Sequence, residues 1–173
     1  MATDRDLTRS VTAVRSLFGA AACSCALVDA DGSTLTFVAA DGEGAAEILG
    51  VELPVGRGIA GWAVMSGQPI AVRDVQADPR FARDIAESTN YVPTSVLAAP
   101  LFDEHGEALG VLEVLDPTVD QASDWTLAVL GTLASQLATI VGRADTGPDG
   151  SALEALGRQV LAAVEAYRPP ERE

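Results

Sequence analysis

The chain has no lysine, a single histidine and only two cysteines, and these shortages limit the functions open to it. All eleven basic residues are arginine and stand against 25 acidic residues, which gives a net charge of −14. Nucleic acids and anionic membranes carry charge of the same sign and would repel such a chain. One histidine and two cysteines cannot supply the four ligands of a Cys and His zinc site. We therefore expect no nucleic acid partner, no membrane partner and no metal site.

Long apolar runs are also missing, although hydrophobic residues make up 48% of the chain. A membrane-spanning helix needs about 20 consecutive apolar residues, and the polar start of the chain lacks the order of a signal peptide. Cys23 and Cys25 stand two apart in an apolar run, so they share one face of a strand. We expect them as small core residues of a cytoplasmic protein, where thiols stay reduced.

The length of 173 residues suits one domain with an appended element. A domain is expected over 1–144 and a linker over 145–150, where Gly and Pro break regular structure. The part from 151 to 173 is expected to hold a C-terminal helix, capped by Ser151, and a short tail.

Hydrophobic periodicity predicts an alternation of helices and strands. Two helices have clear apolar stripes, one formed by Leu7, Val11, Val14 and Phe18, the other by Trp125, Val129, Leu133, Leu137 and Ile140. Asp31 and Gly32 mark a hairpin turn, after which Leu35 and Phe37 share one face. The predicted helices cover 4–18, 43–49, 59–66, 121–142 and 151–167; the predicted strands cover 21–29, 34–39, 51–55, 69–72, 95–102 and 108–115.

The stretch from Val51 to Asp116 carries a specific order of motifs. It contains a glycine-initiated helix, a strand marked by proline, an Asp-Pro loop and two apolar strands. In this order and spacing the chain resembles a GAF domain, the small-molecule sensor module of bacterial and eukaryotic signalling proteins, here as a stand-alone bacterial protein. The resemblance rests on Gly56, Gly58–Gly61, Gly67, Pro69, Ile70, Asp74, Val75, Asp78–Phe81, Tyr91, Ser95–Leu97, Pro100, Leu101, Gly106 and Gly110–Leu112, and extends loosely over 7–144.

The resemblance implies an α+β fold of the GAF/PAS-like type, with a central antiparallel sheet of five or six strands flanked by helices. The first helix and the helix over 121–142 are expected on one face, and the helix over 59–66 with the long loop over 73–94 on the other. Terminal helices of GAF proteins often pair between subunits, so a homodimer is expected.

The loop over 73–94 is the expected place of a ligand site, because loops of this length in compact domains are usually functional or disordered. Glu113 interrupts an apolar strand, so it either faces a pocket or emerges at a sheet edge. Core packing remains an alternative for Trp62 and Phe81, and surface pairing with arginine for Asp84. The candidate ligand-binding residues are Trp62, Phe81, Asp84, Tyr91, Thr94, Ser95 and Glu113.

Several chemistries that related or similar motifs support are not expected here. The GxGxxG pattern at 56–61 precedes a helix too short for a dinucleotide site. Free-methionine sulfoxide reductases share the GAF fold but use cysteines of the central loop region, where this chain has none. Cyclic-nucleotide-binding GAF domains carry an Asn-Lys pair, and the lysine has no counterpart here. His105 lies in a turn between acidic residues. We expect no enzymatic activity and no cofactor.

The sequence therefore predicts a regulatory domain that senses an unidentified small molecule in cytoplasmic signal transduction. The ligand is expected between the sheet and the loop over 73–94, and a separate signalling protein is expected to receive the output. The alternative is a ligand-free dimerisation or protein-interaction scaffold whose pocket is filled by its own side chains.

Overall fold

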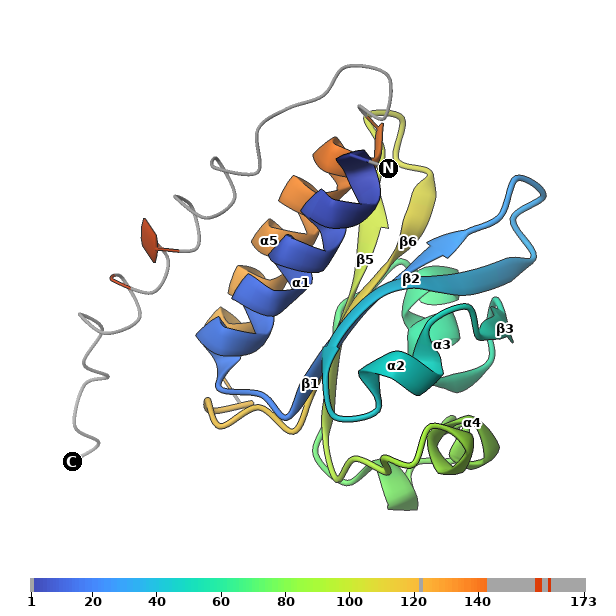
Figure 1. The fold of residues 1–173 in the computed structure, drawn as a ribbon, viewed down its shortest axis with the longest axis vertical. Helices are drawn as coiled ribbons and strands as arrows, with labels where there is room; N and C mark the ends of the chain where they lie inside the picture. Colours follow the sequence, from blue (N-terminus) through green and yellow to red (C-terminus); the bar gives the residue numbers. More distant parts are fainter. Residues whose placement is uncertain (1, 122, 143–157, 160–161, 163–173) are drawn as a thin grey trace.

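The computed structural model describes residues 2–121, 123–142, 158–159 and 162. One antiparallel sheet of six strands, in the order β3-β2-β1-β6-β5-β4, forms the centre of the fold (Figure 1). The α+β fold predicted from the sequence is confirmed. The strands are β1 (Ala22–Val28), β2 (Thr34–Gly42), β3 (Glu52–Pro54), β4 (Ile70–Val72), β5 (Val96–Phe102) and β6 (Ala108–Leu115).

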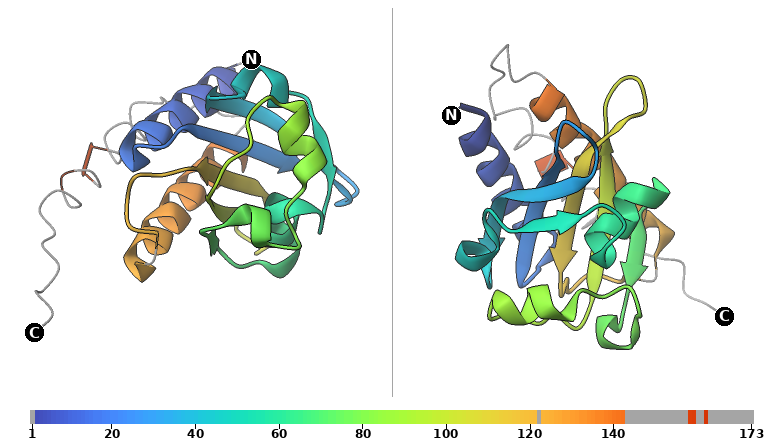
Figure 2. Two further views of the ribbon diagram at one scale, coloured as in Figure 1. Left: turned by 90° about the horizontal axis from the view of Figure 1, so that it is seen from below. Right: turned by 90° about the vertical axis from the view of Figure 1, so that its right-hand side faces the viewer.

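Helices cover both faces of this sheet. Two further views place α1 and α5 on one side of the curled sheet and α3 and α4 on the other (Figure 2). This is the arrangement expected from the sequence. The helices are α1 (Ala2–Phe18), α2 (Ala45–Ile48), α3 (Gly58–Ser66), α4 (Arg83–Ser88) and α5 (Asp124–Gly142), with one 3-10 turn, η1 (Val75–Ala77).

The face of the sheet that packs against α1 and α5 forms a hydrophobic core. The predicted stripe of α1 is confirmed, since Leu7, Val11, Val14 and Phe18 are all at most 3% exposed. Cys23 and Cys25 of β1 are buried in the same cluster as free thiols, as the sequence predicted. Burial alone raises the pKa of the Cys25 thiol to about 12, because the thiolate would lose its hydration.

The buried stripe of α5 differs from the predicted one. Leu133 and Leu137 are buried as expected, whereas Trp125, Val129 and Ile140 are only half-buried. The remaining buried positions of this helix are Thr126, Leu130, Ala134 and Ala138. By length and composition this helix is apolar enough to cross a membrane. In the structure its buried side packs on the sheet and on α1.

Glycine is required where β3 turns into α3. Gly58 has a φ of +69°, in the left-handed region that disfavours side chains. A Cβ atom on Gly61 would lie 2.8 Å from the carbonyl oxygen of Pro54. The glycines of the GxGxxG pattern therefore allow α3 to approach β3 closely and to close one side of the space above the sheet.

The predicted linker over 145–150 lies outside the described residues, as does most of the predicted C-terminal helix over 151–167. Within that helix, Arg158, Gln159 and Ala162 are described, and all three are helical.

Candidate functional site

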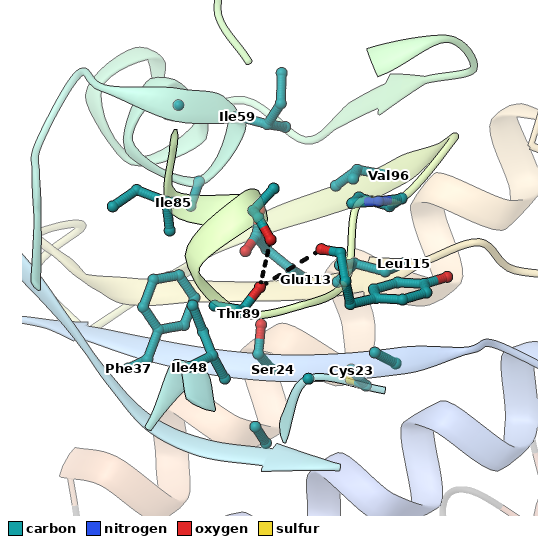
Figure 3. Close-up of a pocket in the computed structure, with 18 of the residues that line it drawn as sticks. Cys23, Ser24, Phe37, Ile48, Ile59, Ile85, Thr89, Val96, Glu113 and Leu115 are labelled. Atoms are coloured by element: carbon teal, nitrogen blue, oxygen red, sulfur yellow. Dashed lines mark hydrogen bonds between the residues drawn. The ribbon is translucent and has the colours of Figure 1, made fainter. Parts of the chain in front are cut away.

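A cavity of about 100 Å³ lies between the sheet and the segment over 73–94 (Figure 3). Strands β1, β2 and β6 form its floor, and α2, α3, α4 and the residues after α4 enclose it from the other side. Most of its lining is apolar, as is typical of small-molecule sites. The large apolar side chains that border it are Phe37, Ile48, Leu53, Ile59, Phe81, Ile85, Val96 and Leu115.

Glu113 lies in the floor of this cavity. Its strand, β6, is flanked by β1 and β5, and Glu113 pairs in register with Ser24 on one side and Ala98 on the other. Of the two positions left open by the sequence, the structure therefore excludes the sheet edge. The side chain is half-buried by accessible area because it borders the cavity, although it lies deep within the fold.

The Glu113 carboxylate has no hydrogen-bond or ion-pair partner among the described residues. Desolvation by the surrounding protein raises the pKa of this carboxyl to about 7. A carboxylate without a partner in apolar surroundings is costly to keep charged. Glu113 is therefore a carboxyl that borders the cavity and whose charged form is disfavoured as long as it has no partner.

Two hydroxyl groups lie close to this carboxylate. Figure 3 shows Ser24, Thr89 and Glu113 pointing into the same part of the cavity. The Thr89 hydroxyl is already engaged, because Oγ1 lies 2.9 Å from the carbonyl oxygen of Ala86. The Ser24 hydroxyl has no partner within the part of the chain that the structure describes. Ser24 and Glu113 thus present two free polar groups side by side on adjacent strands.

The residues after α4 are fastened to the end of β6 by Asp116. Its Oδ1 atom accepts hydrogen bonds from the backbone N–H groups of Thr94, at 2.9 Å, and Ser95, at 2.8 Å. Its Oδ2 atom accepts a hydrogen bond from the Tyr91 hydroxyl. Burial and, after it, this hydrogen bond raise the pKa of Tyr91 above its usual range. Gln121 Nε2 donates to Ser95 Oγ at 2.8 Å and extends this network toward α5.

Three of the seven predicted site residues border the cavity, namely Phe81, Tyr91 and Glu113. Thr94 and Ser95 lie instead in a shallow depression beside Asp116 and Gln121.

The other two predicted residues lie outside the cavity. Trp62 is half-buried and stacks against Arg80, whose guanidinium carbon is 4.5 Å from the ring centre. Asp84 is exposed and pairs with Arg57 at 2.5 Å, which lowers the pKa of that carboxyl. Surface pairing, the alternative that the sequence left open for Asp84, is therefore what the structure shows.

Three residues at or beside the cavity, Ser24, Thr89 and Asp116, were not predicted from the sequence. Ser24 had a usable signal, because it is a polar residue inside the apolar run of β1, just as Glu113 is in β6. Asp116 also had a signal in its position directly after an apolar strand. Thr89 had none, since it lies in a segment without periodicity.

Carboxylates dominate the charge around the cavity. Its lining contains Asp41, Glu43 and Glu113 but no arginine or histidine. Asp41 is paired with Arg15 at 2.5 Å, outside the cavity lining, and Glu43 is exposed at its border. Within the described residues no cluster of three His, Cys, Asp or Glu side chains could hold a metal ion. The cavity therefore offers carboxyl and hydroxyl acceptors to a ligand, and no basic residue lines it.

Comparison with protein families matches residues 4–141 to the GAF domain. This match covers most of the chain, so the chain belongs to the GAF domain family. Members of this family are known for ligand sensing and signalling, and they are typically soluble.

Individual relatives agree with this assignment. The GAF domain of an Acinetobacter phosphoenolpyruvate-protein phosphotransferase superposes with a TM-score of 0.70 at 22% identity, covering 83% of this chain and 84% of that one. Free methionine-R-sulfoxide reductase of Neisseria meningitidis, solved with its substrate, gives 0.66 at 26% identity, over 80% and 77% of the two chains. These likenesses support the fold.

A curated relative matches a shorter part of the chain. Dual 3',5'-cyclic-AMP and -GMP phosphodiesterase 11A of Takifugu rubripes is 32% identical over 66 residues. The match covers 38% of this chain and only 7% of that enzyme. Most of the phosphodiesterase therefore has no counterpart here.

Proposed function

We propose that this chain is a regulatory domain that binds a small molecule in the cavity above Glu113 and passes the binding event to a partner protein in cytoplasmic signal transduction. The single observation that carries the proposal is the apolar cavity with one unpartnered carboxylate in its floor. A polar group that faces an apolar cavity without a partner is a feature of binding sites rather than of stable cores.

The segment over 73–94 is suited to act as the moving part. It contributes Phe81, Ile85, Thr89 and Tyr91 to the cavity, so a bound molecule contacts it directly. The same segment is attached through Asp116 to β6, and through Ser95 to Gln121 just before α5. A ligand that binds better to one arrangement of this segment shifts its population. The position of α5 is the proposed output, read by a separate signalling protein.

We further propose that the domain works without turnover. An activity like that of the similar methionine sulfoxide reductase would require reactive thiols. A thiol reacts through its thiolate form. Both cysteines are buried in β1, and burial raises the pKa of both thiols. This placement supports binding rather than redox catalysis.

The alternative of a ligand-free scaffold rests on a pocket that is filled by the protein's own side chains. This alternative is less well supported, because the side chains leave a cavity of about 100 Å³ unfilled. Homodimerisation through α1 and α5 remains part of the proposal, because the half-buried Trp125, Val129 and Ile140 leave apolar surface on α5.

A melting screen against a metabolite panel tests the proposal. Wild type is compared with Ala45→Phe, since Ala45 borders the cavity and a phenyl ring there occupies the space. We expect at least one metabolite to raise the melting temperature of wild type and to leave the variant unchanged. The ligand-free melting temperature of the variant reports whether it folds. A panel that shifts neither protein, or both equally, would contradict a ligand site in the cavity.

A further inference from the structure

We propose that the cavity selects a small, largely apolar molecule that carries one protonated amine, with the ammonium group held by Glu113 and Ser24. This inference rests on the proposed function, because it names the class of ligand for the same site. It follows from three separate features of the cavity, which are its charge, its free polar groups and its size.

The charge of the lining favours a cation. Three carboxylates border the cavity, and none of its lining residues is basic. Of these three, Asp41 already has Arg15 as its partner and Glu43 is exposed at the border, so Glu113 is the unpaired carboxylate in the floor. An ammonium group placed there gains an attraction that water does not screen as it does at the surface. A phosphate or carboxylate group would find no basic residue in the lining and would lose its own hydration.

The free polar groups match the donors of an ammonium group. An ammonium carries three N–H donors and no acceptor. Glu113 offers acceptor oxygens, and the Ser24 hydroxyl, in register with it on the adjacent strand, offers another acceptor. Neither group has a partner among the described residues, so an ammonium would satisfy both without breaking an existing contact. Hydrogen bonds between charged groups are the stronger kind.

The size of the cavity limits the rest of the ligand. An apolar cavity of about 150 Å³ accommodates benzene, and this cavity measures about 100 Å³. The part of the ligand enclosed in this arrangement is therefore smaller than benzene, with about four or five non-hydrogen atoms. Phe37, Ile48, Ile59 and Ile85 surround the remaining space, so the part beyond the amine is apolar. A cyclic nucleotide exceeds this volume and carries a phosphate, for which the lining offers no basic residue.

A matched set of probes tests the inference. n-Butylammonium, 1-butanol and butyrate have similar size and carry a positive charge, no charge and a negative charge. Each is titrated into ¹⁵N-labelled wild type and Glu113→Gln, with amide chemical shifts as the readout. We expect butylammonium to shift amides around the cavity at millimolar concentration or below, and to bind at least tenfold more weakly to Glu113→Gln. Butanol and butyrate should bind more weakly than butylammonium to wild type.

Two further variants distinguish recognition of the ammonium group from nonspecific effects of a substitution on binding. Ser24→Ala should weaken butylammonium binding several-fold and leave butanol binding within twofold of wild type. Glu107→Gln removes an exposed carboxylate from the loop before β6 and should leave binding of all three probes unchanged. The amide spectrum of each variant without probe reports whether it is folded.

The outcomes distinguish this inference from the proposed function. If butanol or butyrate binds the cavity as well as butylammonium, the preference for a cation is wrong, while a small-molecule site remains. If no probe shifts the cavity amides but a metabolite raises the melting temperature of wild type alone, the ligand class is wrong and the sensor stands. If neither occurs, both proposals fail.

Discussion

The Tyr91 hydroxyl donates a hydrogen bond to the carboxylate of Asp116 and joins the segment over 73–94 to the end of β6. Asp116 has a φ of +48°, a left-handed conformation that aspartate and asparagine adopt more readily than most residues. This conformation brings its carboxylate to the N–H groups of Thr94 and Ser95 as well. One strained residue therefore anchors the segment that encloses the cavity.

Removal of the Tyr91 hydroxyl should loosen this anchor. The Tyr91→Phe variant keeps the ring against the cavity and loses one hydrogen bond to a carboxylate, which costs about 1.5 to 3 kcal/mol. Amide hydrogen exchange should become faster in the residues from 89 to 95 and stay unchanged in β1. Equal exchange rates in the two proteins would show that the Tyr91 contact does not hold the segment.

The Asp116→Asn variant removes the negative charge of the side chain and keeps the backbone conformation. Asparagine tolerates the left-handed φ and can still accept from the two backbone N–H groups, but without the negative charge. We expect a smaller loss of unfolding free energy for Asp116→Asn than for Asp116→Ala, which loses the acceptors and is strained as well. Urea denaturation of the two variants measures the difference. Equal losses would mean that the side-chain acceptors contribute little.

Glu113 should make the fold less stable as the pH rises toward neutral. The pKa of this carboxyl is about 7 in the folded protein, against 4.5 as its ordinary value. Between these values the unfolded chain releases a proton that the folded protein keeps, so the free energy of unfolding falls with rising pH. Above pH 7 the penalty is complete, on the order of 3 kcal/mol.

The other ionisable groups around the cavity are the same in wild type and in the Glu113→Gln variant. Asp41, Glu43, Tyr91 and Cys23 border the same cavity and are unchanged in Glu113→Gln. Their contributions to the pH dependence therefore largely cancel when the variant is compared with wild type.

Urea denaturation of wild type and Glu113→Gln at pH 5 and pH 8 checks this prediction. The variant should gain stability over wild type at pH 8 and much less at pH 5. The exposed Glu107→Gln serves as the control and should show no such pH-dependent gain. A gain of equal size at both pH values would contradict the raised pKa of Glu113.

Two glycines should respond in opposite ways to substitution by alanine. A Cβ atom on Gly110 of β6 would lie 2.1 Å from the carbonyl oxygen of Ala26, within the β1–β6 pairing. Gly131 lies inside α5 with no atom within 4 Å of such a Cβ. Gly110→Ala should therefore destabilise the fold severely, by several kcal/mol.

Gly131→Ala should stabilise the fold by up to about 1 kcal/mol, because alanine favours a helix over glycine. Thermal unfolding of both variants measures the two effects. Similar melting temperatures for Gly110→Ala and Gly131→Ala would contradict the close contact between β1 and β6.

The sequence predicted best those elements whose apolar pattern has one clear face. The stripe of α1 was correct because most residues between Leu7, Val11, Val14 and Phe18 are polar. In α5 apolar residues and alanines stand on more than one face, so the stripe through Trp125 and Ile140 competed with the buried one through Leu130 and Ala134. Periodicity alone cannot choose between two apolar faces.

The site was harder to predict because it depends on contacts between distant parts of the chain. The choice between an edge and a pocket for Glu113 was settled by β1, which pairs with β6 and covers that side of it. Thr94 and Ser95 turn toward Asp116 instead of the cavity, which no local pattern in the loop indicates. The surface pair of Asp84 and Arg57 joins residues 27 positions apart.

Native mass spectrometry of the freshly purified protein tests the central claim most directly, since it reports subunit number and any retained small molecule together. We predict that wild type and Asp84→Ala, whose substitution lies outside the cavity, carry the same reproducible extra mass. Glu113→Gln and the cavity-filling Ala45→Phe should lose it. A wild-type protein free of extra mass that also remains unshifted by the metabolite panel, or a mass retained by Ala45→Phe, would contradict a ligand site in the cavity.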